Sequence, residues 1–470
     1  MKKICLAFGF LVLMIHCESQ PIETQLKKGW QQLKKDSIFR HAIAAVEIRN
    51  LKTGKLVFSD NEEIGLAPAS CQKIFTSIAA FEILGPSYHY VTRVGYDGRI
   101  DSGTLHGNFF IVGSGDPSLG SWRWAETRDN IVINKIIQSI LHQGILRIDG
   151  EIYIDDSKFS FQPVPGGWIW EDIGNYYGAG CWGLNWHENQ YDLILNSGMA
   201  INEPVKIAGW EPRIPLRIFL NEIRSGEKES GDNGYIYLPP YSQIGFAEGT
   251  IPAGSSQFTI SGSMPYAPQQ FARELQDGLD SYHIRPKKGI STWVDRLLIN
   301  KIIPREFTEI LSINSPSFDS LNFWFLKKSI NLYGEVLIKT FAASKFGIGN
   351  TEQGVEILKE FWKEKGIDES SLQIVDGSGL SPQNRVTTAS LVAALRFAQT
   401  RPWFNSFYLA LPEINGMKMK SGSIGGARSY AGYQKSSDNK EYVFAITINN
   451  YGGDASIVVK KIWHFLDLLK

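Results

Sequence analysis

Residues 67–84 read APASCQKIFTSIAAFEIL and hold a serine and a lysine three positions apart, Ser70 and Lys73. The spacing of the apolar residues predicts a helix from about Ser70 to Leu84. Residues three apart lie on one face of a helix, so the Lys73 amine can reach the Ser70 hydroxyl. A serine becomes a nucleophile when a base takes its proton, and a main-chain N–H in the first helical turn is free to face an oxyanion. Alone, S-x-x-K is also common on surface helices that carry a solvated lysine.

Two later segments carry further polar groups. Ser329-Ile330-Asn331 precedes a stretch with helical spacing, where a serine by itself indicates no more than a helix cap. Lys420-Ser421-Gly422, followed by Ser423, lies on a predicted strand. A lysine and two hydroxyls there can hold a carboxylate, and a glycine lets a ligand backbone approach closely. An edge strand protected by a lysine is an equally ordinary interpretation.

The order of the three segments is more informative than any one of them. S-x-x-K, then S-x-N, then K-[ST]-G is typical of the serine penicillin-interacting enzymes. Each segment also has the local context that its chemistry needs: a helix start, a loop before a helix, and a strand.

The rest of the chain divides by its texture. From about residue 90 to 290, short β-like runs alternate with glycine-rich turns, whereas both ends alternate helical and extended patterns. The expected helices are 22–35, 130–144, 268–281, 304–326, 332–343, 351–365, 386–400 and a last one from about 454; the expected terminal strands are 42–48, 55–58, 417–421, 428–434 and 441–449. The pattern predicts one α/β domain made from both ends of the chain, with a β-rich insertion between them.

On these residues the chain resembles the D-alanyl-D-alanine carboxypeptidases/endopeptidases of the low-molecular-mass class C penicillin-binding proteins. Further carriers of the resemblance are Gly113-Ser114-Gly115-Asp116-Pro117, residues 329–335 (SINLYGE) and residues 376–381 (DGSGLS). The long stretch of chain between Ser70 and Ser329 distinguishes this family from the class A β-lactamases, in which the two motifs are much closer together in the sequence.

The resemblance implies an α/β (α+β) penicillin-binding/serine β-lactamase-like transpeptidase domain, an antiparallel sheet flanked by helices. Residues 22–92 plus 288–470 are its expected extent. A large β-rich insertion between the S-x-x-K and S-x-N motifs is expected over 93–287, with a nested smaller β domain around 190–262.

The implied activity is that of a serine-type D-Ala-D-Ala carboxypeptidase that is also a DD-endopeptidase, acting through an acyl-serine. Its implied partners are peptidoglycan stem peptides and β-lactam antibiotics. The implied roles are Ser70 as nucleophile, Lys73 as its base, Ser329 as proton relay, Asn331 as the holder of Lys73 and the substrate amide, and Lys420, Ser421, Gly422 and Ser423 as the substrate-binding strand.

An aromatic stretch in the insertion, residues 167–177, carries adjacent acids, and its ordinary interpretation is a buried aromatic cluster with a helix cap. The resemblance implies instead that Asp172 pairs with the free amine of the stem-peptide diamino acid and that Tyr177 packs on the same side chain. Three positions depart from the family pattern. Cys71, next to the nucleophile, stands where a threonine-like residue is usual, and we expect it to be packed and not catalytic. Ser421 replaces the usual threonine, and Pro382 stands where a basic residue often follows the D-G-S-G-L-S run.

Charge and composition exclude several classes of protein. The 48 Lys and Arg balance the 48 Asp and Glu, which argues against a nucleic-acid binder. No H-x-x-x-H or C-x-x-C spacing occurs in the sequence, so neither a metal nor a cofactor is expected. Of the four cysteines, Cys71 and Cys181 lie in the body of the chain, and their spacing leaves pairing open.

The N-terminus has the pattern of a targeting segment. Two lysines precede an apolar run from Ile4 to Ile15, which predicts a signal peptide over 1–18 and export to the periplasm. An uncleaved anchor helix and a lipid anchor at Cys17 are the alternatives. No other window is apolar enough to predict a membrane-spanning segment in the mature chain.

Two other functions fit the same motifs. One is a non-catalytic peptidoglycan-binding protein, against which the intact Ser70, Lys73, Ser329, Asn331 and Lys420 argue. The other is a β-lactamase or esterase, which would need a deacylating acid near the serine and a compact chain. The balance between carboxypeptidase and endopeptidase activity depends on which acceptor the insertion admits.

Overall fold

The computed structural model describes residues 21–299 and 306–470, so the predicted signal peptide 1–18 and Cys17 lie outside the described residues. Within the described part, none of the helices combines the length and apolar character that crossing a membrane requires.

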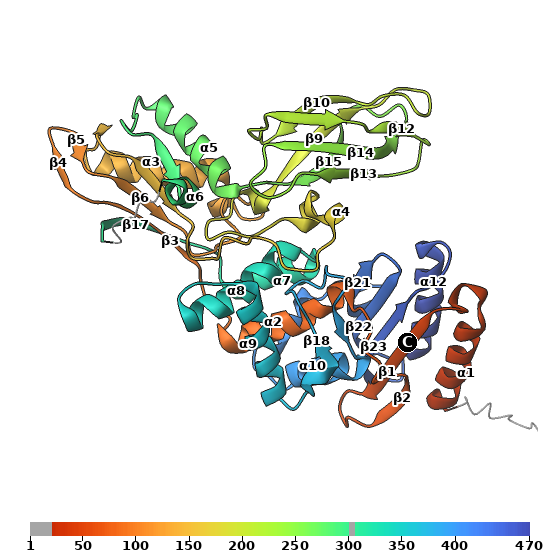
Figure 1. The fold of residues 1–470 in the computed structure, drawn as a ribbon. Helices are drawn as coiled ribbons and strands as arrows, with labels where there is room; N and C mark the ends of the chain where they lie inside the picture. Colours follow the sequence, from red (N-terminus) through yellow and green to blue (C-terminus); the bar gives the residue numbers. More distant parts are fainter. Residues whose placement is uncertain (1–20, 300–305) are drawn as a thin grey trace, which may run out of the picture.

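A six-stranded sheet forms the centre of the domain that carries the three motifs (Figure 1), in the order β2-β1-β23-β22-β21-β20. Its strands are β1 (Ile43–Asn50), β2 (Leu56–Asp60), β20 (Glu413–Ile414), β21 (Met417–Ile424), β22 (Ala427–Lys435) and β23 (Glu441–Asn449). Every pairing is antiparallel, and β1 pairs with β23 over its whole length. The prediction of an antiparallel sheet built from both ends of the chain is therefore confirmed.

Helices cover both faces of this sheet, so its central strands β1, β22 and β23 are largely buried on both sides. Alternate residues of β23 enter different cores: Val443 and Ala445 join one cluster, and Phe444 and Ile446 join the other. The first core holds α2 (Lys73–Ile83), α7 (Phe318–Lys327), α8 (Asn331–Phe346), α9 (Thr351–Glu364), α10 (Thr388–Gln399) and α11 (Phe404–Ala410). The second holds α1 (Ile22–Lys35) and α12 (Ala455–Leu466).

The insertion begins with a five-stranded sheet in the order β16-β8-β6-β3-β17. Its strands are β3 (Val91–Tyr96), β6 (Phe109–Val112), β8 (Ile152–Asp155), β16 (Ile290–Thr292) and β17 (Thr308–Asn314). Helices α3 (Asp129–His142) and α5 (Ala267–Ser281) pack on it in one core, with α6 (Trp293–Leu298) beside β16. A small sheet of β4 (Arg99–Asp101), β5 (Thr104–His106) and β7 (Arg147–Ile148) adjoins.

The prediction of a helix over 304–326 is wrong. Residues 304 and 305 lie outside the described residues, 308–314 form strand β17 against β3, and only α7 is helical. The β-branched Thr308, Ile310 and Ile313 favour an extended chain, and Pro316 interrupts any helix that would continue to α7. The predicted boundary at 287/288 falls inside the sheet, because β16 and β17 follow it. The division into two parts stays a prediction.

A separate β unit lies within the insertion, in the range expected for a nested domain (Figure 1). It contains β9 (Gln190–Asn196), β10 (Lys206–Glu211), β11 (Ile218–Asn221), β12 (Arg224–Gly226), β13 (Asn233–Tyr237), β14 (Ile244–Pro252) and β15 (Phe258–Ser263). Its two sheets enclose a core of their own around Leu193, Ile236 and Ile260. The short helices α4 (Trp170–Ile173) and η4 (Tyr176–Gly178) connect it to the rest: α4 packs on β13, and η4 packs on β15 and on α8.

Candidate active site

Ser70 lies in a short 3-10 turn, η2 (Ala69–Gln72), which runs directly into α2. Its side chain is half-buried and faces the cleft, whereas Lys73, one turn later, is fully buried. Ala69 has φ +44°, a left-handed conformation that costs a non-glycine residue about 1–2 kcal/mol. The chain thus enters the helix by a sharp turn that presents Ser70 at its tip.

The Lys73 amine has three oxygen neighbours: Ser70 Oγ at 2.9 Å, Asn331 Oδ1 at 2.6 Å and the Ser378 carbonyl oxygen at 2.7 Å. Burial lowers the pKa of Lys73 well below its usual value, and the charge of Lys420 lowers it further. A neutral amine has two N–H donors and one lone pair. It can donate to the amide and the carbonyl while its lone pair accepts the Ser70 proton. The arrangement therefore suits a base.

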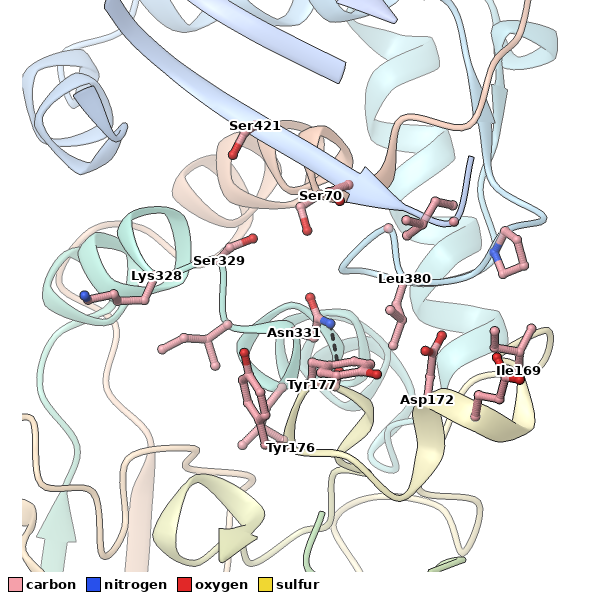
Figure 2. A pocket seen from close by; sticks show the side chains of 18 of the residues that line it. Ser70, Ile169, Asp172, Tyr176, Tyr177, Lys328, Ser329, Asn331, Leu380 and Ser421 are labelled. Carbon is pink, nitrogen blue, oxygen red and sulfur yellow. Dashed lines mark hydrogen bonds between the residues drawn. The ribbon is translucent and has the colours of Figure 1, made fainter. Parts of the chain in front are cut away.

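The second motif approaches from the other side of the cleft. Ser329 sits between α7 and α8 with φ +57°, and Asn331 begins α8. Figure 2 shows Ser70, Ser329 and Asn331 around one shared space. The Asn331 side chain also donates Nδ2–H to the Tyr177 carbonyl at 2.7 Å. One amide thus joins the base to the insertion.

The third motif lies on β21, beside the turn that carries Ser70. Ser421 and Ser423 line the cleft, whereas Lys420 is buried and donates to the Ser421 carbonyl at 2.7 Å. Burial lowers the pKa of Lys420 to about 8. Gly422 faces η2: a Cβ on it would lie 2.3 Å from the Pro68 carbonyl oxygen. Glycine is needed here for the approach of the protein's own backbone.

Cys71 is packed behind the nucleophile. Its thiol donates to the Lys420 carbonyl oxygen at 3.2 Å, and burial raises its pKa to about 11. Cys71 and Cys181 are both free and buried, so the two thiols do not pair.

Two buried acids, Asp376 and Glu335, position the backbone behind Lys73. They were named above only as parts of the segments 376–381 and 329–335. Asp376 accepts hydrogen bonds from the main-chain N–H groups of Gly379 and Ser381, each at 2.7 Å, and from the Trp168 indole at 2.9 Å. Glu335 accepts from the Ser378 N–H at 2.9 Å, and burial raises its pKa. Together they hold the loop whose Ser378 carbonyl faces Lys73. The signal available in the sequence was the acid Glu335 within the mostly apolar stretch 332–338 of α8, and Asp376 had no comparable signal.

The three motifs and the insertion enclose a cleft of about 1160 Å³. Asp172 on α4 and Tyr177 on η4 line it, as the resemblance implied (Figure 2). Burial, and then the charge of Glu171, raises the pKa of Asp172 to about 6. Burial and the charge of Asp172 also raise the pKa of Tyr177. Ser70, Ser329, Asn331, Ser421 and Ser423 also line this cleft, whereas Lys73, Lys420 and Gly422 are buried.

Sequence reasoning missed several charged residues in the cleft walls. They are Arg123, Glu188, Lys328 and Arg428. Arg123 binds Glu188 through Nε at 2.7 Å and Nη2 at 3.0 Å. Arg123 and Glu188 lie far apart in the chain and belong to no recognisable motif. Lys328 and Arg428 lie close to Ser329 and Ser423 in the sequence, but they are not part of the motifs.

One cluster of metal-ligating residue types occurs among the described residues, in the insertion. Asp129, His187 and Glu274 bring one ligand atom each within 4.8 Å of one another. His187 Nε2 lies 3.0 Å from Glu274 Oε2, which also accepts from the Trp186 indole at 2.9 Å, and Gln270 donates to Glu274 Oε1 at 2.7 Å. The Glu274 carboxylate is thus satisfied by protein donors.

Comparison with known proteins places the chain in a family. The model of the D-Ala-D-Ala carboxypeptidase 3 (S13) family matches residues 27–417. A D-alanyl-D-alanine carboxypeptidase of Actinomadura sp. (strain R39) is 24% identical, over 93% of this chain and 83% of the relative. The D-alanyl-D-alanine carboxypeptidase DacB of Haemophilus influenzae is 23% identical, over 88% of this chain and 87% of the relative.

A solved structure shares the fold. The crystal structure of penicillin binding protein 4 (dacB) from Haemophilus influenzae superposes with a TM-score of 0.78 at 21% identity, covering 95% of this chain and 99% of that one. The same protein has been solved in complex with a β-lactam. These findings confirm the fold class and the resemblance inferred from the three motifs. The chain belongs to the D-Ala-D-Ala carboxypeptidase 3 (S13) family.

Proposed function

We propose that this chain hydrolyses the peptide bond between two D-alanines through an acyl-enzyme on Ser70. The observation that carries the proposal is the Lys73 amine, which is buried and in contact with Ser70 Oγ, Asn331 Oδ1 and the Ser378 carbonyl. The lone pair of neutral Lys73 accepts the Ser70 proton as Oγ attacks the carbonyl carbon. Main-chain N–H groups of Ser70 and Ser423 stabilise the oxyanion, a contribution of about 100- to 1000-fold per donor in comparable sites.

Collapse of the tetrahedral intermediate breaks the C–N bond and releases D-alanine. Ser329 passes its hydroxyl proton to the departing nitrogen and takes a proton from the Lys73 ammonium in return, so D-alanine leaves with a neutral amine and Lys73 is neutral again. Water then attacks the ester, and the proton that it loses returns through Lys73 to Ser70. Acyl transfer to water regenerates the free hydroxyl. Lys420 takes no proton in this sequence: its charge lowers the pKa of Lys73.

The cleft walls support a peptidoglycan stem peptide as the substrate. Asp172 pairs with the free amine of the diamino acid, and Tyr177 packs along the same side chain. The cleft of about 1160 Å³ exceeds the usual size of a small-ligand pocket, so it has room for a cross-linked acceptor as well as for a terminal D-alanine. That volume favours DD-endopeptidase activity beside the carboxypeptidase activity. Export by residues 1–18 brings the enzyme to the periplasm, where such a substrate occurs.

A fluorescent penicillin tests the acyl-enzyme step. A penicillin resembles the D-Ala-D-Ala end and leaves a slowly hydrolysed ester on the serine. We expect the wild-type protein to be labelled, Ser70→Ala to be unlabelled, and Ser437→Ala, an exposed serine in the β22–β23 turn, to be labelled like the wild type. Absence of labelling in the folded wild type would contradict the mechanism.

Substrate choice needs a second assay. Incubation with a purified pentapeptide monomer should release free D-alanine, and incubation with a cross-linked dimer should yield monomers. Turnover of neither by a protein that penicillin labels would favour the non-catalytic alternative.

A further inference from the structure

The substrate of the proposed function ends in a carboxylate, and few basic groups in the cleft are available to meet it. Three basic residues line the cleft: Arg123, Lys328 and Arg428. Arg123 is held by both oxygens of Glu188, so its charge is already compensated. Lys328 lies beside Ser329, but its amine points away from the space between Ser70, Ser329 and Asn331 (Figure 2). Lys420 is buried, and its amine donates to the Ser421 carbonyl.

Arg428 stands on β22 directly opposite Ser423, the last hydroxyl of the third motif. Its Nη1 donates to Ser423 Oγ and to the Ala427 carbonyl, the latter at 3.1 Å. Its guanidinium carbon lies 5.9 Å from the centre of the Tyr451 ring. Among the ion pairs found in residues 21–299 and 306–470, none involves Arg428. Its charge therefore has no carboxylate partner within the described protein.

Arg428 lines the cleft, and the turn beside it is uncrowded. Gly425 and Gly426, which form the turn between β21 and β22, have no atom within 4 Å of where a Cβ would stand. Pro382, which also lines the cleft, offers neither a charge nor an N–H. A carboxylate that follows the β21 hydroxyls would meet Arg428 at the end of the strand.

We propose that Arg428, together with the Ser423 hydroxyl to which it is hydrogen-bonded, binds the C-terminal carboxylate of the substrate. The inference rests on the proposed acyl-serine function and adds to it a residue that determines specificity. A planar guanidinium offers paired N–H donors to a carboxylate and stays charged at all working pH values. Arg428 thereby selects substrates with a free carboxyl group next to the bond to be cut.

A pair of thioesters tests the inference: an N-acyl-D-alanyl thioglycolate, which ends in a carboxylate, and its carboxamide counterpart. The measured quantity is the ratio of kcat/KM for the acid to kcat/KM for the amide. We expect Arg428→Ala and Arg428→Gln to lower kcat/KM for the acid about 10- to 100-fold and to leave that for the amide unchanged, since only the acid loses a charge-assisted contact. Arg428→Lys should recover part of the ratio.

The matched control is Lys435→Ala, which removes one positive charge from the exposed far end of the same strand. It should leave the ratio unchanged. An unchanged ratio in Arg428→Gln, or an equal loss for both thioesters, would overturn the inference. A wild-type protein that penicillin does not label and that cleaves neither thioester would instead overturn the proposed function.

Discussion

Substitution of Gly422 by alanine should separate the nucleophile from the strand that binds the substrate. The added Cβ would lie 2.3 Å from the Pro68 carbonyl oxygen, 2.3 Å from Ser429 Oγ and 3.0 Å from the Cys71 nitrogen. Ordinary contacts begin at 3.4 Å, so β21 and η2 must move apart by about 1 Å. Overpacking of this kind costs about 1–3 kcal/mol of stability. A displacement of about 1 Å in an active site can cost about 100-fold in rate.

The assay is the second-order rate of acylation by a fluorescent penicillin, measured beside thermal unfolding. We expect Gly422→Ala to acylate about 100-fold more slowly and to melt at a lower temperature. Gly65→Ala is the matched control. It lies in the loop that leads to Ser70, and its Cβ would meet only the Arg385 Cβ at 3.5 Å, an ordinary contact. If Gly422→Ala melts at a lower temperature but is acylated at the wild-type rate, the reasoning is refuted, because the structure would then relieve the clash without displacing Ser70.

Three further substitutions test other parts of the molecule. Lys73→Gln should slow acylation about 100- to 10,000-fold, because the variant lacks the base that accepts the Ser70 proton. In a pH–rate profile of the wild type, the acylation rate should fall as the pH drops through the lowered pKa of Lys73, since the protonated amine cannot accept a proton. Asp172→Asn should lower kcat/KM for peptides with a free diamino-acid amine but not for their N-acetylated forms, and in the wild type this preference should decline below pH about 6, where Asp172 becomes protonated. Burial raises the pKa of Asp116 from 3.8 to about 6, so between pH 3.8 and pH about 6 the folded state binds more protons than the unfolded state. The free energy of unfolding should therefore fall by up to about 3 kcal/mol as the pH rises through this range. In urea denaturation at a series of pH values, Asp116→Asn should show a smaller fall over the same range.

Local pattern predicted much of the fold because the elements of the terminal domain are amphipathic or strongly apolar. Residues 22–35 form a helix with the predicted bounds, since Leu26, Trp30 and Leu33 repeat at helical spacing after Pro21. The strand at 441–449 also has the predicted bounds, because nearly all of its residues are buried between two layers. The helix predicted over 304–326 was wrong because the apolar residues of this segment fit the period of a strand as well as that of a helix. The strand forms because the segment pairs with β3, more than 200 positions earlier in the chain.

The site was predictable where a motif carried it and unpredictable where tertiary contacts did. Ser70 and Lys73 share a helix face, so their contact follows from their spacing. The ion pair of Arg123 with Glu188 depends on how distant segments come together. Arg428 lies across a tight turn from Ser423, but it belongs to none of the motifs. Gly422 was expected to let a ligand backbone approach. In the structure its lack of a side chain instead makes room for the main chain at Pro68, just before Ser70.

The link between Asn331 and residue 177 uses the carbonyl of the main chain, which every amino acid possesses. The identity of the side chain at that position is thus independent of the support that Asn331 gives to the base. Mutation at 177 can reshape the wall of the cleft and leave this hydrogen bond in place. The shape of the cleft wall at residue 177 is thereby uncoupled from the hydrogen bonds that position the Lys73 amine.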